Sequence, residues 1–103
     1  MKLRIKGNSI RIRLTKTEVS NFEQNGFYQE ETNFGNAKLV YAIKRSSTHQ
    51  QLSTDMLESC ITLYIPETIA NEWTSTDLVG FQNKYQHNAC LLSSYVYQTN
   101  SHY

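Results

Sequence analysis

The first fourteen residues alternate between charged or polar side chains and apolar ones, and this pattern strongly limits what the chain can fold into. The apolar members of the pattern are Leu3, Ile5, Ile10, Ile12 and Leu14. A period of two predicts β-strands, and Gly7-Asn8 in the middle favours the tight turn of a hairpin. Parity sets Ile5 opposite Ile10 and Arg4 opposite Arg11. The segment is therefore predicted to be a hairpin with one apolar and one basic face.

A short helix is predicted directly after this hairpin. Thr15 and Glu18 have the spacing of a capping box, in which each side chain satisfies a free backbone N–H. Val19 and Phe22 would share one helix face, and Gly26 favours a C-terminal stop. Two more strands are expected at 27–34 and 37–45, joined through Gly35-Asn36 and followed by a polar loop.

The second half of the chain repeats this plan. Its strands are expected at 52–57, 60–65, 78–85 and 90–97. Pro66 is expected to begin a helix with Ile69 and Trp73 on one face. A shift of 51 residues maps Ile10 to Ile61 and Phe22 to Trp73. Few residues are identical between the halves, so this is a repeat of pattern.

We therefore predict a single domain, residues 1–103, of the α+β class. It would be mainly antiparallel β, with two pseudo-symmetric strand–strand–helix–strand–strand units forming a small sheet or barrel with two short helices. The units would span about 1–51 and 52–103. The predicted core comprises Leu3, Ile5, Ile10, Ile12, Leu14, Val19, Phe22, Met56, Ile61, Leu63, Ile65, Ile69 and Trp73, with Phe27 and Phe34 also assigned to it.

The segment KGNSIRIRLTKTEV, within residues 6–25, resembles the start of the MazE/AbrB-type antitoxins and transition-state regulators. That family typically has Gly-Asn-Ser, an apolar–Arg–apolar strand end, Pro and a short helix. The matching residues here are Gly7, Asn8, Ser9, Arg13 and Leu14. Thr15 stands where the family usually has Pro, whereas the second half keeps the proline at Pro66.

This resemblance implies a fold and a function. Such proteins pair as dimers with swapped hairpins, so this chain would hold both units as a single-chain pseudo-dimer. It also implies DNA contact by Lys6, Arg11 and Arg13. Family dimers use two basic hairpins, and only one half of this chain is basic. The chain also resembles small uncharacterised bacterial proteins that open with M-K-[IL]-R-I-K-G-N-S, which implies no activity.

The basic residues are distributed unevenly. Six of the ten lie in the first sixteen positions without an acid among them, and all nine acids follow from Glu18 onward. The candidate nucleic-acid-binding residues are Lys2, Arg4, Lys6, Arg11 and Arg13. Like charges across a strand pair are unfavourable unless an anion lies near, and a phosphate backbone would supply one. Alternatively, these cations pair with Glu30 and Glu31 on the third strand, or are solvated and prevent edge-to-edge aggregation.

No catalytic residue, metal site or cofactor is predicted. His49, Cys60, His87 and Cys90 lack paired metal-ligand spacing, and the four glycines are isolated, so there is no phosphate-binding loop. Both cysteines are expected to be reduced, and the chain to be cytoplasmic without a membrane partner. We predict a non-enzymatic binding or interaction module whose partner, for example a protein, is unknown. The alternative is a DNA-binding regulator or antitoxin; a small enzyme is the least favoured class.

Overall fold

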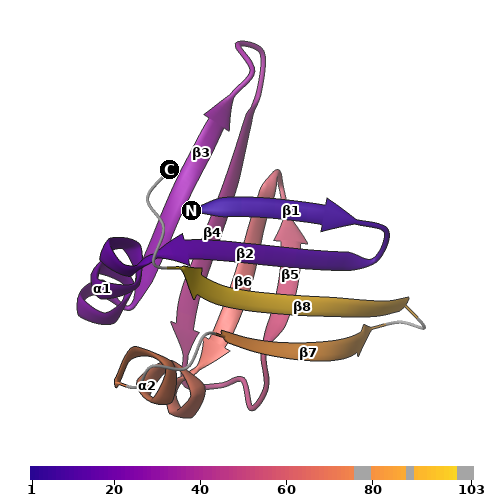
Figure 1. Ribbon diagram of the computed structural model, residues 1–103. Coiled ribbons are helices and arrows are strands. Elements are labelled where there is room, and N and C mark those ends of the chain that lie inside the picture. Colours follow the sequence, from indigo (N-terminus) through magenta and orange to yellow (C-terminus); the bar gives the residue numbers. More distant parts are fainter. Residues whose placement is uncertain (76–79, 88–89, 100–103) are drawn as a thin grey trace.

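The computed structural model describes residues 1–75, 80–87 and 90–99, which form two four-stranded sheets and two helices (Figure 1). The strands are β1 (Lys2–Lys6), β2 (Ser9–Thr15), β3 (Phe27–Asn33), β4 (Lys38–Ser46), β5 (Ser53–Leu57), β6 (Cys60–Pro66), β7 (Gly80–His87) and β8 (Cys90–Thr99). The helices are α1 (Lys16–Asn25) and α2 (Glu67–Ser75). The predicted α+β class is confirmed. Residues 78 and 79 of the predicted strand 78–85 lie outside the described residues.

Each sheet consists of two antiparallel hairpins joined by a parallel pair of strands. The first sheet has the order β1-β2-β8-β7 and the second the order β3-β4-β6-β5, with β2–β8 and β4–β6 parallel. Helix α1 leads the chain from the first sheet into the second, and α2 leads it back. Each sheet therefore combines one hairpin from residues 2–46 with one from residues 53–99. Local sequence patterns did not predict these parallel pairs, because a hairpin is closed by its own turn and a parallel pair needs a distant segment.

The first hairpin has the predicted register. Leu3 pairs with Ile12, Ile5 with Ile10, and Arg4 with Arg11. Gly7 lies in the turn with a φ of 52°, a left-handed conformation that glycine adopts without steric cost. Parity of the side chains was therefore sufficient to predict this part of the fold.

The first helix also begins and ends as predicted. Thr15 and Glu18 form the capping box, and the N–H of Gly26, at a φ of 79°, donates to the carbonyl of Phe22 at 2.8 Å. The prediction for the second helix was wrong at one residue. Pro66 is the last residue of β6, paired with Ser46, and α2 begins at Glu67. Proline lacks a backbone N–H, so it is tolerated both at the end of a strand, as here, and at the start of a helix, as predicted.

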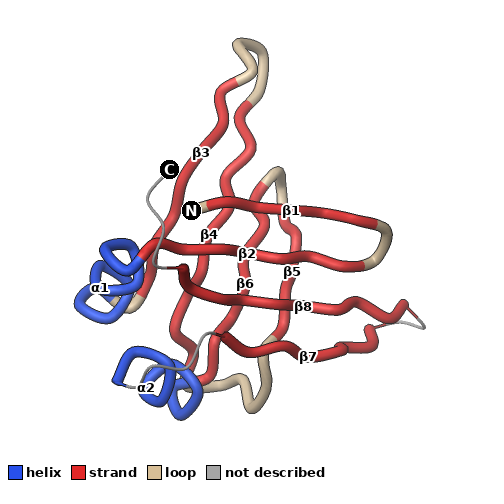
Figure 2. The backbone as a smooth tube through the Cα atoms, viewed as in Figure 1, coloured by secondary structure: helices blue, strands red, loops and turns tan. Residues whose placement is uncertain are grey.

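The two sheets face each other with their strands crossing, and α1 and α2 lie side by side at one end (Figure 2). The core lies between these layers. It comprises Ile12, Leu14, Val19, Phe22, Ile43, Leu52, Leu63, Ile65, Ala70, Trp73 and Val96. Phe22 and Trp73 connect the two helices, because their ring centroids are 6.1 Å apart and both side chains are fully buried.

Four predicted core residues are exposed. Ile5 and Met56 face inward but lie beside their hairpin turns, where the facing sheet leaves them 56% and 69% exposed. Phe27 points to the outer face of the second sheet, and Phe34 lies at the turn between β3 and β4. Alternation predicts which face a side chain takes, but only the overlap of the sheets decides whether that face is covered. Ile43, Leu52 and Val96 are buried without having been predicted.

Candidate functional site

The outer face of the β1–β2 hairpin is basic, as the sequence predicted. Since Ile12 and Leu14 are buried against the core, the alternate residues of β2 and their partners on β1 point outward. Lys2, Arg4, Lys6 and Arg11 are exposed, and Arg13 is half-buried. These five residues form what we call the basic face. Strand β1 is the edge of the first sheet, so the face is open along one side (Figure 1).

A small hollow lies within the basic face. It has a volume of about 130 Å³ and is lined by Arg4, Lys6, Ser9 and Arg11. Arg4 and Arg11 are directly opposite each other across the two strands, as are Lys6 and Ser9. Three cations and a hydroxyl therefore line the hollow, and no described carboxylate does. This chemistry suits an anion, because guanidinium groups donate paired hydrogen bonds to phosphate or carboxylate oxygens.

The two acids of the third strand form ion pairs with cations outside this face. Glu30 forms an ion pair with the Met1 ammonium, and Glu31 Oε1 lies 3.7 Å from Lys38 Nζ. Among the residues whose side chains the structure describes (1–73 and Val96), Arg4 and Lys6 form no ion pair. The alternative in which internal pairing neutralises the basic hairpin stays a prediction. These adjacent acids point to opposite faces of β3.

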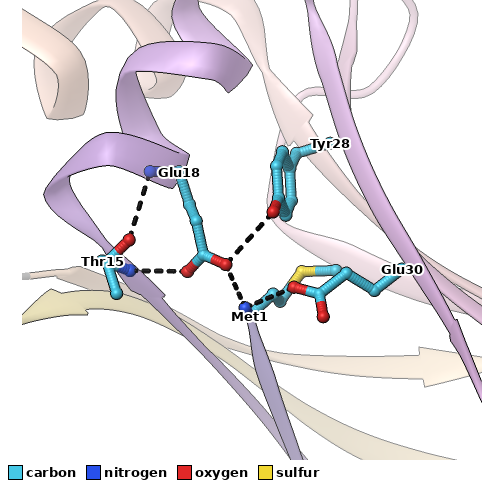
Figure 3. Close-up of polar contacts among 5 residues, drawn as sticks. All are labelled: Met1, Thr15, Glu18, Tyr28 and Glu30. Carbon is cyan, nitrogen blue, oxygen red and sulfur yellow. Dashed lines mark hydrogen bonds and ion pairs between the residues drawn. The ribbon is translucent and has the colours of Figure 1, made fainter. Parts of the chain in front are cut away.

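A second polar group, the amino-terminal cluster, was not predicted. It comprises Met1, Thr15, Glu18, Tyr28 and Glu30 (Figure 3). The Met1 ammonium donates to carboxylate oxygens of both Glu18 and Glu30. Glu18 Oε1 accepts from the Thr15 N–H at 2.8 Å, and its Oε2 accepts from the Tyr28 hydroxyl at 3.2 Å. Glu18 thus caps α1 and also connects Met1, the residue before β1, with Tyr28 on β3. The sequence predicted only the cap, because the other contacts are long-range.

The pKa shifts in this cluster indicate a structural role. Burial alone would lower the pKa of the Met1 ammonium and raise that of Glu18. Their mutual hydrogen bonds outweigh burial, so the ammonium pKa is raised and the Glu18 pKa is lowered. Burial, followed by the negative charges of Glu18 and Glu30, raises the pKa of Tyr28 to about 12. These three pKa values all move away from neutrality, which is the opposite of what acid–base catalysis at neutral pH requires.

The His49 side chain contacts Ser46 and Tyr64. Its Nδ1 lies 2.6 Å from Ser46 Oγ, and its ring stacks on Tyr64 with centroids 4.4 Å apart. Ser46 Oγ also accepts from the backbone N–H groups of Thr48 and His49. Thr48 Oγ1 also lies within hydrogen-bond distance of Ser46 Oγ, at 3.2 Å. The contact between Ser46 and His49 connects the end of β4 with the loop that follows it.

Of the four residues considered as metal ligands, the structure describes the side chains of His49 and Cys60. Cys60 is a half-buried free thiol, and its Sγ lies 3.6 Å from Thr62 Oγ1. Where the structure describes side chains, no three His, Cys, Asp or Glu residues are grouped so as to hold a metal ion. The side chains of His87 and Cys90 lie outside those described.

No helix in the described part of the chain is long and apolar enough to cross a membrane.

Comparison with known proteins identifies the family of the chain. No curated protein and no solved structure matches the chain, so the resemblance to the MazE/AbrB type stays a prediction. Residues 1–95 match the model of a family of unknown function, DUF7009. Because this match covers most of the chain, the protein belongs to the DUF7009 family.

Proposed function

We propose that the protein is a non-enzymatic binding module whose basic face contacts the phosphate backbone of a nucleic acid. The observation that carries this proposal is the opposition of Arg4 and Arg11 at a hollow that Lys6 also lines. Phosphate contacts of this kind supply most of the affinity in non-specific binding to nucleic acids. The alternative of solvated cations predicts the same surface but no affinity for polyanions.

The energetic argument is that like charges lie directly opposite each other on this face. Like charges directly opposite each other destabilise a strand pair. The cost is about 0.2–1 kcal/mol if it equals in size the stabilisation that a pair of opposite charges provides. Arg4 opposite Arg11 and Lys2 opposite Arg13 repeat this arrangement on neighbouring pairs. A phosphate group placed between such residues changes repulsion into attraction.

The structure also suggests which residues would contribute most. The resemblance to MazE/AbrB-type proteins points to Lys6, Arg11 and Arg13. Arg13 is half-buried, whereas Arg4 and Arg11 are exposed and line the hollow. The equivalent face of β5 and β6 pairs Asp55 with Thr62 and carries no cation among its paired residues. Contact is therefore expected through one hairpin, with a dissociation constant of about 1–100 µM at moderate salt.

The test is fluorescence anisotropy with a labelled random DNA duplex of about 20 base pairs, at about 50 and 200 mM salt. We expect binding that weakens as the salt concentration rises. For three or four phosphate contacts, the logarithm of the association constant should fall with the logarithm of the salt concentration with a slope of about −3 to −4. The double variant Arg4→Gln/Arg11→Gln should bind at least about tenfold more weakly, with a slope closer to zero by about two.

A matched control separates this face from net charge. Lys38→Gln/Lys44→Gln removes the same two charges from the second sheet and should leave the affinity nearly unchanged. An equal loss in both double variants would show that the basic face has no special role. Absence of binding at low salt, where non-specific attraction is strongest, would refute the proposal.

A further inference from the structure

The outer face of the second sheet carries another hollow, on the side of the molecule opposite the basic face. Its volume is about 350 Å³, within the usual range for small-molecule sites. The outward residues that line it are Phe27, Gln29, Ala42, Lys44, Cys60 and Thr62. They come from β3, β4 and β6, three neighbouring strands.

The hollow exists because a small residue occupies the middle of this face. Ala42 pairs with Gln29 on one side and with Thr62 on the other. In the next row Phe27 lies opposite Lys44. A methyl group among longer side chains leaves a depression between them, and the sheet forms its floor.

The lining has a definite chemistry. Phe27 is 48% exposed, so its ring offers an apolar surface that the core does not use. Among the described residues, Lys44 is the only cationic side chain that lines the hollow, and it forms no ion pair with any of them. Glu31, on the same face, is engaged by Lys38, and Asp55 lies on the far side of Thr62. An aromatic surface beside one unneutralised cation favours a flat ligand with a negative charge.

We propose that this hollow binds a small flat aromatic molecule that carries a carboxylate or a similar acidic group. The ring of the ligand lies against Phe27 and the Ala42 methyl, and its acidic group lies near Lys44 Nζ. Gln29 and Thr62 provide an amide and a hydroxyl for polar ring substituents. The site is separate from the basic face and does not depend on nucleic-acid binding.

The test is a titration with 2-naphthoate followed by ¹H–¹⁵N NMR spectra of the intact chain. We expect saturable shifts at the amides of Gln29, Ala42, Lys44 and Thr62, with a dissociation constant of about 1 mM or below. Neutral 2-naphthamide should bind at least about fivefold more weakly, because it lacks the charge that meets Lys44. In Lys44→Gln, 2-naphthoate should bind about as weakly as 2-naphthamide. Ala42→Leu, which fills the hollow, should abolish the shifts.

Three results would overturn the proposal. The first is no saturable shift at these amides up to about 10 mM ligand, well above the expected constant. The second is equal affinity for naphthoate and naphthamide in the unaltered protein. The third is loss of naphthoate binding in Arg4→Gln/Arg11→Gln, which would place the ligand on the basic face. If Ala42→Leu does not fold, the Lys44→Gln variant and the neutral ligand still decide.

Discussion

Replacing Glu18 with Gln tests the amino-terminal cluster most directly. The carboxylate of Glu18 accepts from the Met1 ammonium, the Thr15 N–H and the Tyr28 hydroxyl. Glutamine preserves the size of the side chain and one acceptor oxygen, so it can retain part of the helix cap. It removes the negative charge and turns one acceptor into a donor, which faces the ammonium.

The expected loss follows from these contacts. Hydrogen bonds to charged groups contribute about 1.5–3 kcal/mol each, and a helix cap about 1 kcal/mol. The Glu18 side chain is only 15% exposed, so solvent screens its pair with Met1 weakly. Because Glu30 still faces the ammonium, we expect a net loss of about 2 kcal/mol in the free energy of unfolding. For a domain of this size that corresponds to a fall in Tm of about 8–15 °C.

The loss should also depend on pH. The folded pKa of Glu18 is below 4.5, so its contribution is present above about pH 4.5 and is lost as the pH falls through the folded value. The folded pKa of the Met1 ammonium is above 8.0, so its contribution is present below about pH 8 and is lost as the pH rises through the folded value. The difference in the free energy of unfolding between the variant and the unaltered protein should therefore be largest between about pH 5 and 8, and smaller below and above this range.

The assay is urea denaturation followed by tryptophan fluorescence at pH 3, 7 and 10, on protein prepared with Met1 as its first residue. The matched control is Glu31→Gln, because Glu31 is 54% exposed in an exposed pair with Lys38 and should contribute about 0–0.5 kcal/mol. Equal stability of Glu18→Gln and the unaltered protein at pH 7 would refute the reasoning. So would a difference that stays constant across the three pH values.

Three further predictions concern other parts of the fold. Phe22→Ala should cost about 3–5 kcal/mol in urea denaturation, because the ring is fully buried against Trp73; an unchanged midpoint would contradict the helix packing. Ser59→Gly should raise the free energy of unfolding by about 0.5–1 kcal/mol, since Ser59 has a left-handed φ of 65°, and Ser59→Ala, the control, should bring no gain. Spectrophotometric titration should show one tyrosine ionising near pH 12 that is absent from Tyr28→Phe; an unchanged curve in that variant would argue against its burial beside Glu18.

Much of the local structure could be predicted because it depends on residues close together in the chain. The register of β1 and β2 follows from parity around Gly7, and the bounds of α1 follow from Thr15, Glu18 and Gly26. Each of these features is held by backbone hydrogen bonds or caps between neighbours. The basic face was predicted for the same reason, since alternation alone sets which side chains of one hairpin share a face.

The neighbours of each hairpin could not be predicted in this way. The pairing of β2 with β8 brings Ser9 beside Ser93, and no turn between adjacent strands specifies such a contact. The hollow of the second sheet needs three strands in register before Ala42 lies between Gln29 and Thr62. The amino-terminal cluster needs the packing of β1, α1 and β3 before two carboxylates meet one ammonium.

By itself, the sequence determined the hairpins, the caps of the first helix and the side of each strand that faces inward, because these depend on the geometry of a few successive residues. The tertiary structure decided which inward residues are covered. Ile5 and Ile12 share the inner face of the first sheet, yet Ile12 is buried and Ile5 is 56% exposed. The reason is physical: alternation is a property of one strand, whereas burial depends on where the facing sheet ends.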